Sequence, residues 1–498
     1  MRNKLLIVSL IGLFVVGGVF WLRISRPQQT ILTHTSTYSQ SEFYDDAYAA
    51  ARPVQPVSGT YGVLVNHHLL AAPLIAEALS AVATTKPVTV VLISPNHFSV
   101  GQARVIASGA TWETPYGAVQ PDLASIRALT DHNLAQVEEA PFDHEHGIAG
   151  VVAFIKKSLP NARIVPLILN DRLPVTQAQE AAKRMASLLP NDALIVGSFD
   201  FSHYVPSRAA QFHDELSLSV VQRSDYADIP RLDIDSRPGL ALFLQLLAEK
   251  KSARFTLLEH ANSAELTRTP DTLETTSYIT GYFTSAEHDG GLAPGDGVNT
   301  ALFLGRLETS PEVQSGLEPR SKKYAIEYLQ RFLTGQQLTI TGASESNPSG
   351  IFSRVGFTHF AGEESTYDVG GAKVSYVAGD SLVRARELIN LGSRIVCMTS
   401  GEPKIEEYRG GLIIQGLGDF LTREVLEKTK HTTLAIGVVV EVNKLRVYIF
   451  PIQYQQGKGK LLVGSADDTL LTTLAAQSAV SGVLKEQIKK GVLTISIK

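Results

Sequence analysis

The sequence has almost no cysteine, since Cys397 is the only one in 498 residues. A single thiol excludes an intramolecular disulfide framework and a cysteine-rich zinc site. Cys397 stands inside the apolar run from Ile395 to Met398. We therefore expect it to be a small, buried hydrophobic residue.

The chain also lacks an excess of charge of either sign. It has 45 basic and 49 acidic residues, a net charge of −4, and no block of lysine or arginine beyond the N-terminus. Nucleic-acid binding needs a basic patch or stripe, so we expect no nucleic-acid partner. There is no internal repeat or low-complexity tract, and the content of 44% hydrophobic and 19% charged residues is typical of a globular protein of two or three domains.

Long hydrophobic runs are absent except at the N-terminus, where Leu5 to Leu22 form an uncharged run of 18 residues between basic residues. At about 1.5 Å per residue this run can just cross a bilayer core. A cleaved signal peptide usually has a shorter apolar region and an Ala-x-Ala site. We therefore expect an uncleaved transmembrane signal anchor over residues 1–26, with the bulk of the chain extracytoplasmic; a buried core helix and a cleaved signal peptide are the alternatives.

The rest of the chain reads as two α/β domains joined by linkers. Residues 27–58 show no sustained period and are predicted to be a linker, and the Gly/Pro/Asp-rich residues 287–298 are predicted to be a second one. In the first domain, residues 59–286, continuous apolar runs alternate with helical patterns. This alternation indicates a sheet that is covered by helices on both faces. The second domain, residues 299–498, becomes rich in strand patterns toward its end.

Histidine is concentrated in the first domain: nine of the thirteen lie between residues 60 and 284. Several lie in polar clusters that follow apolar runs, namely Asn66-His67-His68, Ser94-Pro95-Asn96-His97, Asp143-His144-Glu145-His146 and Asp200-Phe201-Ser202-His203. Because the carboxyl ends of parallel strands converge on one crevice, residues far apart in the chain can meet there. The pattern predicts a metal or acid/base site, while any one of these histidines could be an ordinary surface residue.

Ordered motifs in this domain resemble the MEMO family, called system protein B of the AmmeMemoRadiSam set in bacteria and related in fold to class III extradiol dioxygenases. The resemblance covers roughly residues 60–284 and implies a three-layer α/β fold. Its motifs are Val65-Asn66-His67, Ser94-Pro95-Asn96-His97, Thr114-Pro115-Tyr116-Gly117, Asp143-His144-Glu145-His146, Ser198-Phe199-Asp200-Phe201-Ser202-His203, His260-Ala261-Asn262-Ser263 and Ser277-Tyr278-Ile279-Thr280-Gly281. The chain departs from the family after the first histidine, where His68-Leu69-Leu70 replaces Ala-Gly-Tyr.

The resemblance implies roles for individual residues. His67 and His97 become the two imidazole ligands of a metal, with Glu265 as the candidate third ligand; a solvated loop carboxylate is the other interpretation of Glu265. His203 becomes the acid/base histidine, with Asp200 as its partner. The expected second shell consists of Asp143, Glu145 and His146. Such a site suits Fe(II), with Cu or Zn as alternatives, and leaves positions open for substrate and O₂.

The second domain resembles the CapA-type poly-gamma-glutamate synthesis proteins, which have a metallophosphoesterase fold. The likeness lies in residues 302–305, 388–396 and 411–420. Arg306 stands where a metal-binding Asp is expected, and residues 398–404 replace a histidine-rich region. A two-metal site cannot be built without those ligands, so we expect a degenerate domain that serves as a scaffold or as a surface for a partner protein.

Two functions follow from these observations. The first is a membrane-anchored, non-haem-iron-dioxygenase-like or other redox enzyme acting on a small molecule of unknown identity. The second is a non-catalytic metal-binding or scaffold protein, because kinship in fold does not determine function.

Overall fold

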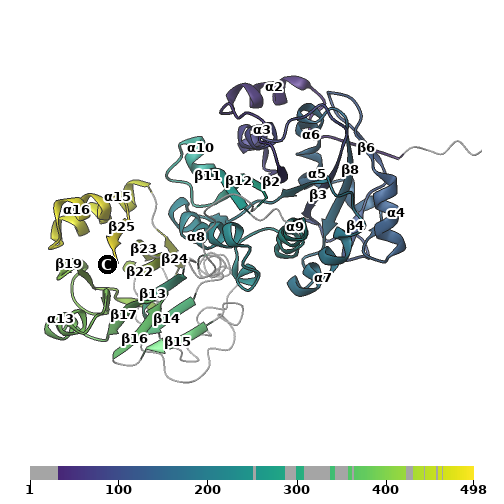
Figure 1. The fold of residues 1–498 in the computed structure, drawn as a ribbon. Helices are drawn as coiled ribbons and strands as arrows, with labels where there is room; N and C mark the ends of the chain where they lie inside the picture. Colours follow the sequence, from purple (N-terminus) through teal and green to yellow (C-terminus); the bar gives the residue numbers. More distant parts are fainter. Residues whose placement is uncertain are drawn as a thin grey trace, which may run out of the picture.

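Figure 1 shows two parts of the chain packed together, an N-terminal part coloured purple to teal and a C-terminal part coloured green to yellow. The computed structural model describes residues 32–250, 254–285, 299–307, 332, 337–341, 357–361, 364–421, 430–441, 443–455, 458–461 and 464–497. The first part is built around one large sheet, and the second around two.

The described residues include no helix that is long and apolar enough to cross a membrane. The predicted anchor, Leu5 to Leu22, lies outside the described residues. We correct the expectation of a single-pass membrane protein with an extracytoplasmic bulk accordingly, because no described helix supplies the span that it requires.

The first part is organised around a ten-stranded sheet with a parallel centre. The central strands lie side by side in the order β2 (Thr60–Val65), β9 (Leu194–Ser198), β3 (Val88–Pro95) and β8 (Ala162–Leu169). The flanking strands are β12 (Thr275–Thr284), β10 (His203–Val205), β11 (Arg254–Asn262), β4 (Val105–Ala107), β6 (Gln120–Pro121) and β7 (Gln136–Val137). The central strands are continuous runs of apolar residues because both of their faces are buried.

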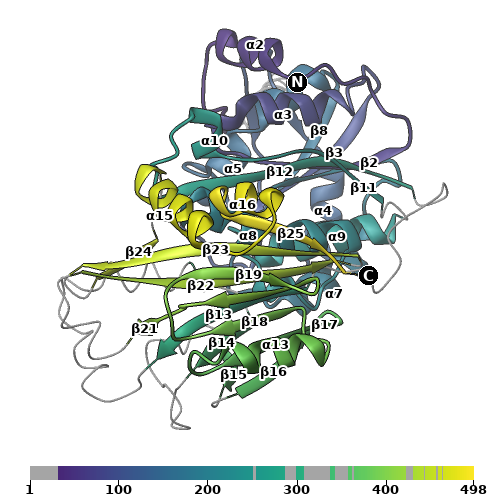
Figure 2. The same cartoon turned by 90° about the vertical axis from the view of Figure 1, so that its left-hand side faces the viewer.

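Helices cover both faces of this sheet, so the first part is a three-layer α/β domain, as predicted (Figure 2). Successive strand residues point to opposite faces: in β3, Val90 and Leu92 pack in one core and Val91 and Ile93 in the other. The first core is completed by α2 (Ser41–Ala50), α3 (Ala72–Ser80), α5 (His146–Ala149) and α6 (Val152–Ser158). The second is completed by α4 (Leu123–Asp131), α7 (Val175–Ala186), α8 (Ser207–Arg223) and α9 (Arg237–Glu249).

Part of the segment that we expected to be a linker, residues 27–58, belongs to the folded domain. Strand β1 (Thr33–Thr35) pairs in parallel with β5 (Thr111–Glu113), and helix α2 buries Tyr44 and Ala47. The helix was not predicted because the segment is polar overall and only one narrow face of the helix is apolar. The linker expectation is corrected for these elements.

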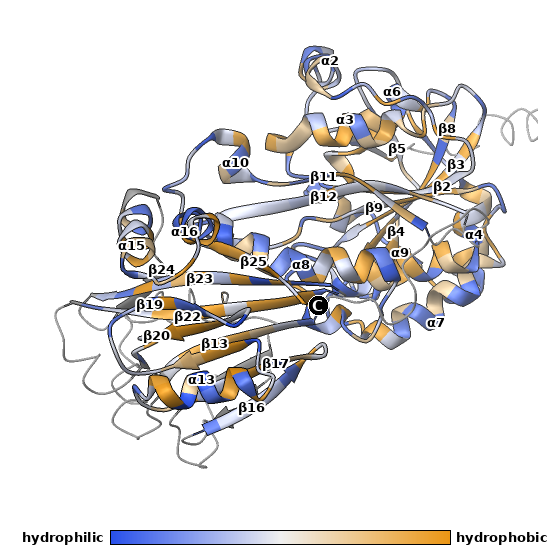
Figure 3. Ribbon diagram, turned by 60° about the vertical axis from the view of Figure 1, so that its left-hand side comes forward, coloured by the Kyte–Doolittle hydropathy of each residue, from blue (hydrophilic) through white to orange (hydrophobic). Residues whose placement is uncertain are grey.

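The second part consists of two sheets that share a core. The larger sheet contains β13 (Asn299–Leu307), β14 (Gln337–Thr341), β15 (Phe357–Ala361), β21 (Asp419–Leu421), β22 (Lys430–Glu441), β23 (Lys444–Gln455), β24 (Lys458–Leu461) and β25 (Val492–Ser496). The smaller one contains β16 (Glu364–Val369), β17 (Ala372–Val377), β18 (Ile395–Met398), β19 (Lys404–Tyr408) and β20 (Gly411–Gln415). Figure 3 shows how apolar residues concentrate along these strands. The metallophosphoesterase type of this part stays a prediction.

Helices pack around these two sheets: α13 (Leu382–Asn390) covers the smaller sheet, and α15 (Gly464–Gln477) and α16 (Gly482–Lys489) add residues to the shared core. Cys397 is buried in this core, as expected. The sequence pattern also predicts a helix near residues 321–334, and this segment lies outside the described residues, apart from Phe332.

Helix α8 of the first part makes contacts with the second part. Phe212 on α8 packs against the ring of Tyr448, with ring centroids 5.3 Å apart, and a side chain at Gly437 would collide with it. Glu215 accepts hydrogen bonds from Arg446 and from the Tyr448 hydroxyl, each at 2.6 Å. Helix α8 begins two residues after β10, so these contacts connect the C-terminal part to the strand that carries His203.

Candidate metal centre

The predicted residues gather at the carboxyl edge of the parallel strands. His67, His97 and Asp200 are each the second residue after a central strand, β2, β3 and β9 respectively. Because these strands are neighbours and run in the same direction, the three residues are brought to one crevice. This regular placement is the structural origin of the site.

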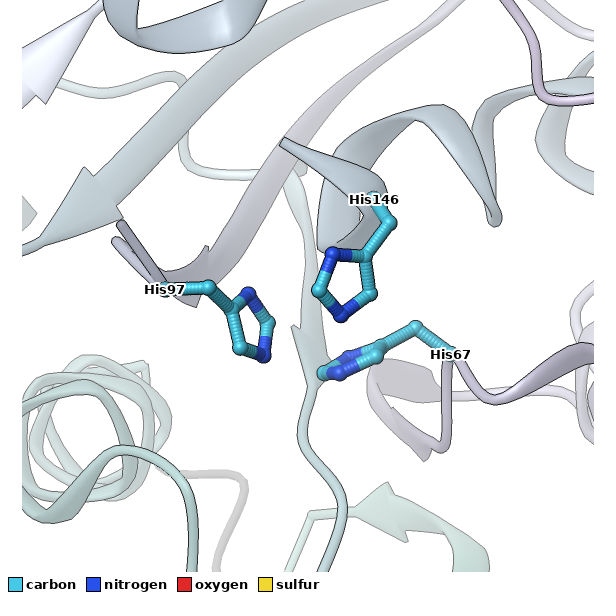
Figure 4. Close-up of side chains that lie close together, drawn as sticks. All are labelled: His67, His97 and His146. Carbon is cyan, nitrogen blue, oxygen red and sulfur yellow. The ribbon is translucent and has the colours of Figure 1, made fainter. Parts of the chain in front are cut away.

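Three imidazoles converge there. Ring nitrogens of His67, His97 and His146 lie within 4.8 Å of one another, and Figure 4 shows the three side chains directed toward a common point. The ring of His67 is 4.9 Å from that of His97, and His146 stacks on His97 at 3.9 Å. His67 is buried, whereas His146 is exposed. His146, expected in the second shell, is thus close enough to be a ligand itself.

The hydrogen bonds of His67 leave one ring nitrogen available. The Ser198 hydroxyl donates to the backbone oxygen of Gly147 at 2.8 Å, so its oxygen must accept a proton from Nδ1 of His67, 3.1 Å away. This network assigns the tautomer with the proton on Nδ1. The unprotonated Nε2 of His67 is therefore free to bind a cation.

Glu145 orients His97 in a similar way. This buried carboxylate accepts the backbone N–H of His97 at 2.9 Å and lies 2.6 Å from its Nδ1. It also accepts the backbone N–H of Gly147, at the start of α5. Burial raises the pKa of Glu145, but these hydrogen bonds outweigh it and hold the pKa below the usual value. A carboxylate on Nδ1 directs Nε2 of His97 into the site, which is the usual arrangement for a metal-binding histidine.

We expect Glu145→Gln to weaken metal binding by about 10- to 100-fold, the usual cost of losing a group that orients a ligand. Glutamine has one acceptor oxygen for three donors, and its amide would face one of them. Isothermal titration with Co(II) measures the change, with Glu180→Gln on the exposed face of α7 as the control. Equal affinities of the two variants would show that Glu145 does not orient a ligand.

Two carboxylates complete the cluster. Nε2 of His67 lies 3.4 Å from Oδ2 of Asp200 and 3.3 Å from Oδ2 of Asp235, and these three residues form a second group with ligand atoms within 4.8 Å. Asp200 also accepts the backbone N–H of His67 at 3.2 Å. Burial and the neighbouring Asp200 raise the pKa of Asp235 well above its usual value. Such a raised pKa is typical of two buried carboxylates that share one place.

Burial lowers the pKa of His67 to about 4, against a partial opposing effect of Asp200. The imidazole is consequently neutral at pH 7, the form in which histidine binds metals. Partial desolvation of its ring nitrogens and the neighbouring His97 likewise lower the pKa of His146. The histidines are thus prepared as ligands and not as cations.

The donor set fits a metal ion. Imidazole nitrogens and carboxylate oxygens face one another here, and all of them can accept hydrogen bonds. Such acceptor atoms repel one another unless a proton or a cation lies between them. Within the described part of the chain, Oδ1 of Asp235 is buried and has no hydrogen-bond partner. The other oxygen of this carboxylate, Oδ2, lies against His67 and His97, so a cation at the site could satisfy the orphaned oxygen as well.

The other predicted residues lie apart from this cluster. The backbone N–H of His203 donates to Asp233 at 3.3 Å, and its ring lies beside Tyr204. The side chain of Asp143 is 60% exposed and lies 3.6 Å from His34. Neither His203 nor Asp143 belongs to the two groups found among the described residues.

Glu265 has a local structural role. Its Oε2 accepts the backbone N–H of Asn262 at 3.0 Å and its Oε1 accepts the side chain of Gln211 at 2.6 Å. The first bond belongs to the capping box of α10 (Ser263–Thr267). Glu265 lines a separate cavity of about 410 Å³ between α8, α10 and the C-terminal part. It is in neither of the two groups found among the described residues.

Asp235 is the residue that sequence reasoning missed. It lies in the loop before α9 and follows no strand, so the rule of polar residues after strands does not find it. The sequence feature that could have pointed to it is a pair of acidic residues, Asp233 and Asp235, just before a helix. Such a pair is more often a solvated helix N-terminus. Pairing of this loop with residues 200–203, including the Phe201–Ile234 bridge, brings it to the site.

Fold and cluster together define an α/β protein with a candidate metal centre of histidine and carboxylate residues. A family model described as Memo-like protein matches residues 53–282. A MEMO1 family protein of Pyrobaculum aerophilum is 30% identical over 224 residues, which cover 42% of this chain and 78% of the relative. A MEMO1 family protein of Caldivirga maquilingensis is 28% identical over 226 residues, which cover 41% of this chain and 76% of the relative. The chain belongs to the MEMO1 family.

Among solved structures, Vps29 of Chaetomium thermophilum in complex with a cyclic peptide matches 34% of this chain and 95% of its own, with 14% identity and a TM-score of 0.22. A TM-score this low establishes no shared fold, and nothing about the C-terminal part follows from it.

Proposed function

We propose that the first part of the chain binds a single metal ion through His67 and His97 and uses it in oxidative, dioxygenase-like chemistry on a small molecule. The observation that carries the proposal is the locking of both Nδ1 atoms, by Ser198 and Glu145, which turns both Nε2 atoms toward one buried carboxylate. Fe(II) is the ion that we propose, because two imidazoles and a carboxylate with open positions are the donor set of non-haem iron oxygenases. The same donors also accept Cu or Zn.

An Fe(II) ion would supply the redox chemistry with O₂ that such a reaction requires. The residues of the chain do the rest. Ser198 and Glu145 orient the imidazoles, and the burial of His67 keeps water from that side of the site. We propose that His203 moves a proton at the substrate and that Asp200, three residues earlier, supports it. The exposed face, where His146 and Phe98 lie with ring centroids 6.2 Å apart, is the side from which a substrate would enter.

Metal binding by the full-length protein tests this proposal. We expect the wild type to bind one Fe(II) or Co(II) ion and to gain thermal stability from it, since a ligand that binds only the folded state stabilises that state. His67→Ala should weaken binding about 100-fold or more because a ligand is lost. His132→Ala, an exposed histidine at the end of α4, should bind like the wild type.

A wild type that binds no transition metal, in calorimetry and in metal analysis after loading, would overturn the proposal. Tight metal binding without O₂ uptake across a panel of small-molecule substrates would instead favour the second candidate, a non-catalytic metal-binding protein.

A further inference from the structure

We infer that Asp235 completes the metal site with His67 and His97, and that His146 stays outside the ligand set as an imidazole on its open side. This inference rests on the proposed function, because it names the third ligand of the same site. It replaces Glu265 in that role, since both oxygens of Glu265 are bound elsewhere.

Asp235 is in contact with both imidazoles. Its Oδ2 lies 3.3 Å from Nε2 of His67 and 3.8 Å from Nε2 of His97. These are the two ring nitrogens on the side opposite to the Nδ1 atoms that Ser198 and Glu145 contact. A cation placed among these three atoms would meet two imidazoles and one carboxylate.

The position of Asp235 is fixed by its backbone partners. The backbone N–H of Asp200 donates to Oδ2 of Asp235 at 2.8 Å, and the backbone N–H of Asp235 donates to the oxygen of Asp200 at 3.1 Å. Two loops are thereby tied together, and the Phe201–Ile234 bridge continues the pairing. A ligand held in this way needs no rearrangement to bind, which favours affinity.

Asp200 is the weaker candidate. Its Oδ1 accepts the backbone N–H of His67, and within the described residues its carboxylate has an ion-pair contact with His67 but none with His97. Among the described carboxylates, Asp235 alone lies against the free nitrogens of both His67 and His97. Toward the metal, Asp200 therefore acts through its backbone, which positions Asp235. This leaves unchanged the supporting role proposed above for Asp200 beside His203.

His146 lacks the features that mark the other two histidines as ligands. A metal-binding histidine usually donates its second ring nitrogen to a fixed acceptor. His67 and His97 have such acceptors, but the ring of His146 has no hydrogen-bond partner within the described structure. It is exposed, and it contacts other rings: it stacks on His97 and meets His67 and Phe98 edge to face. This leaves His146 free to face a substrate.

Co(II) titration of full-length variants separates the candidates. We expect Asp235→Asn to weaken Co(II) binding about 100-fold or more, and His146→Ala to change it by less than about 3-fold. Asp171→Asn is the matched control, because Asp171 is an exposed carboxylate just past the end of β8, at the same edge of the sheet. It should bind like the wild type, and circular dichroism establishes that each variant is folded.

Proton NMR of the Co(II)-loaded wild type gives an independent readout that needs no variant. Each bound imidazole contributes one exchangeable, strongly shifted N–H proton, so the proposed site predicts two and a three-histidine site predicts three. Three such signals, or a loss of affinity in His146→Ala as large as in Asp235→Asn, would overturn the inference. So would wild-type affinity in a folded Asp235→Asn variant. A wild type that binds no Co(II) would show instead that the proposed function itself has failed.

Discussion

Replacing Gly147 with alanine is expected to destabilise the first part of the chain by about 2 kcal/mol and to abolish metal binding. A Cβ atom at this position would stand 1.8 Å from Oγ and 3.1 Å from Cβ of the buried Ser94. Overpacking of this kind costs about 1 to 3 kcal/mol, more than the roughly 1 kcal/mol that alanine gains over glycine in a helix.

Metal binding suffers because Gly147 supports both imidazoles. Its backbone oxygen accepts the Ser198 hydroxyl, and its N–H donates to Glu145, so a shift of this residue disturbs the partners of His67 and His97 together. Urea unfolding and Co(II) titration measure the two effects.

Gly109→Ala is the matched control, because a Cβ at Gly109 would meet its nearest neighbours at an ordinary 3.7 Å. Adding Ser94→Gly to Gly147→Ala removes the colliding side chain and should restore part of the stability. If the Gly147 and Gly109 variants behave alike, the close approach of α5 to β3 is not what shapes the site.

The second large expected effect is a loss of stability of the metal-free protein at acidic pH. Burial lowers the pKa of His67 to about 4, whereas an unfolded histidine titrates near pH 6.5. Between these values the unfolded state binds a proton that the folded state does not, so the stability of the metal-free protein falls as the pH decreases from about 6.5 to about 4. The full loss is about 3 kcal/mol, since one pKa unit corresponds to about 1.4 kcal/mol.

Asp235 changes the stability of the metal-free protein with pH in the opposite direction. Burial and Asp200 raise its pKa, so its protonated form is favoured by folding and its contribution weakens as the pH rises above the unfolded value of about 4. His67→Gln should therefore remove the loss of stability in acid, and Asp235→Asn should make the metal-free protein more stable at neutral pH. Urea unfolding of the three proteins at pH 7 and pH 4.5 measures both effects. An equal loss of stability in acid for the wild type and His67→Gln would contradict the buried, neutral state of His67.

The central sheet could be predicted from the sequence because its strands carry an unambiguous signal. The apolar runs at residues 90–93 in β3 and 164–169 in β8 are typical of a sheet that is buried on both faces. The rule that polar residues at the ends of parallel strands meet located His67, His97 and Asp200, since each is the second residue after a central strand. The positions of these three residues follow from the local sequence together with the parallel arrangement of the strands.

Asp235 and Glu265 could not be assigned in that way. Asp235 reaches the site through the pairing of two loops that are far apart in the sequence. Glu265 is next to a family motif in sequence, but a helix cap uses its carboxylate locally. Proximity along the chain is thus a weak guide to ligand identity, because side-chain direction is decided by tertiary contacts.

X-ray absorption at the iron edge of the Fe(II)-loaded, full-length protein tests most directly the claim that these strand ends form a metal centre. We expect one iron per chain, with scattering from two imidazole rings that disappears in the His67→Ala/His97→Ala double variant. A protein that retains no iron after loading, or a spectrum without imidazole scattering, would contradict the account.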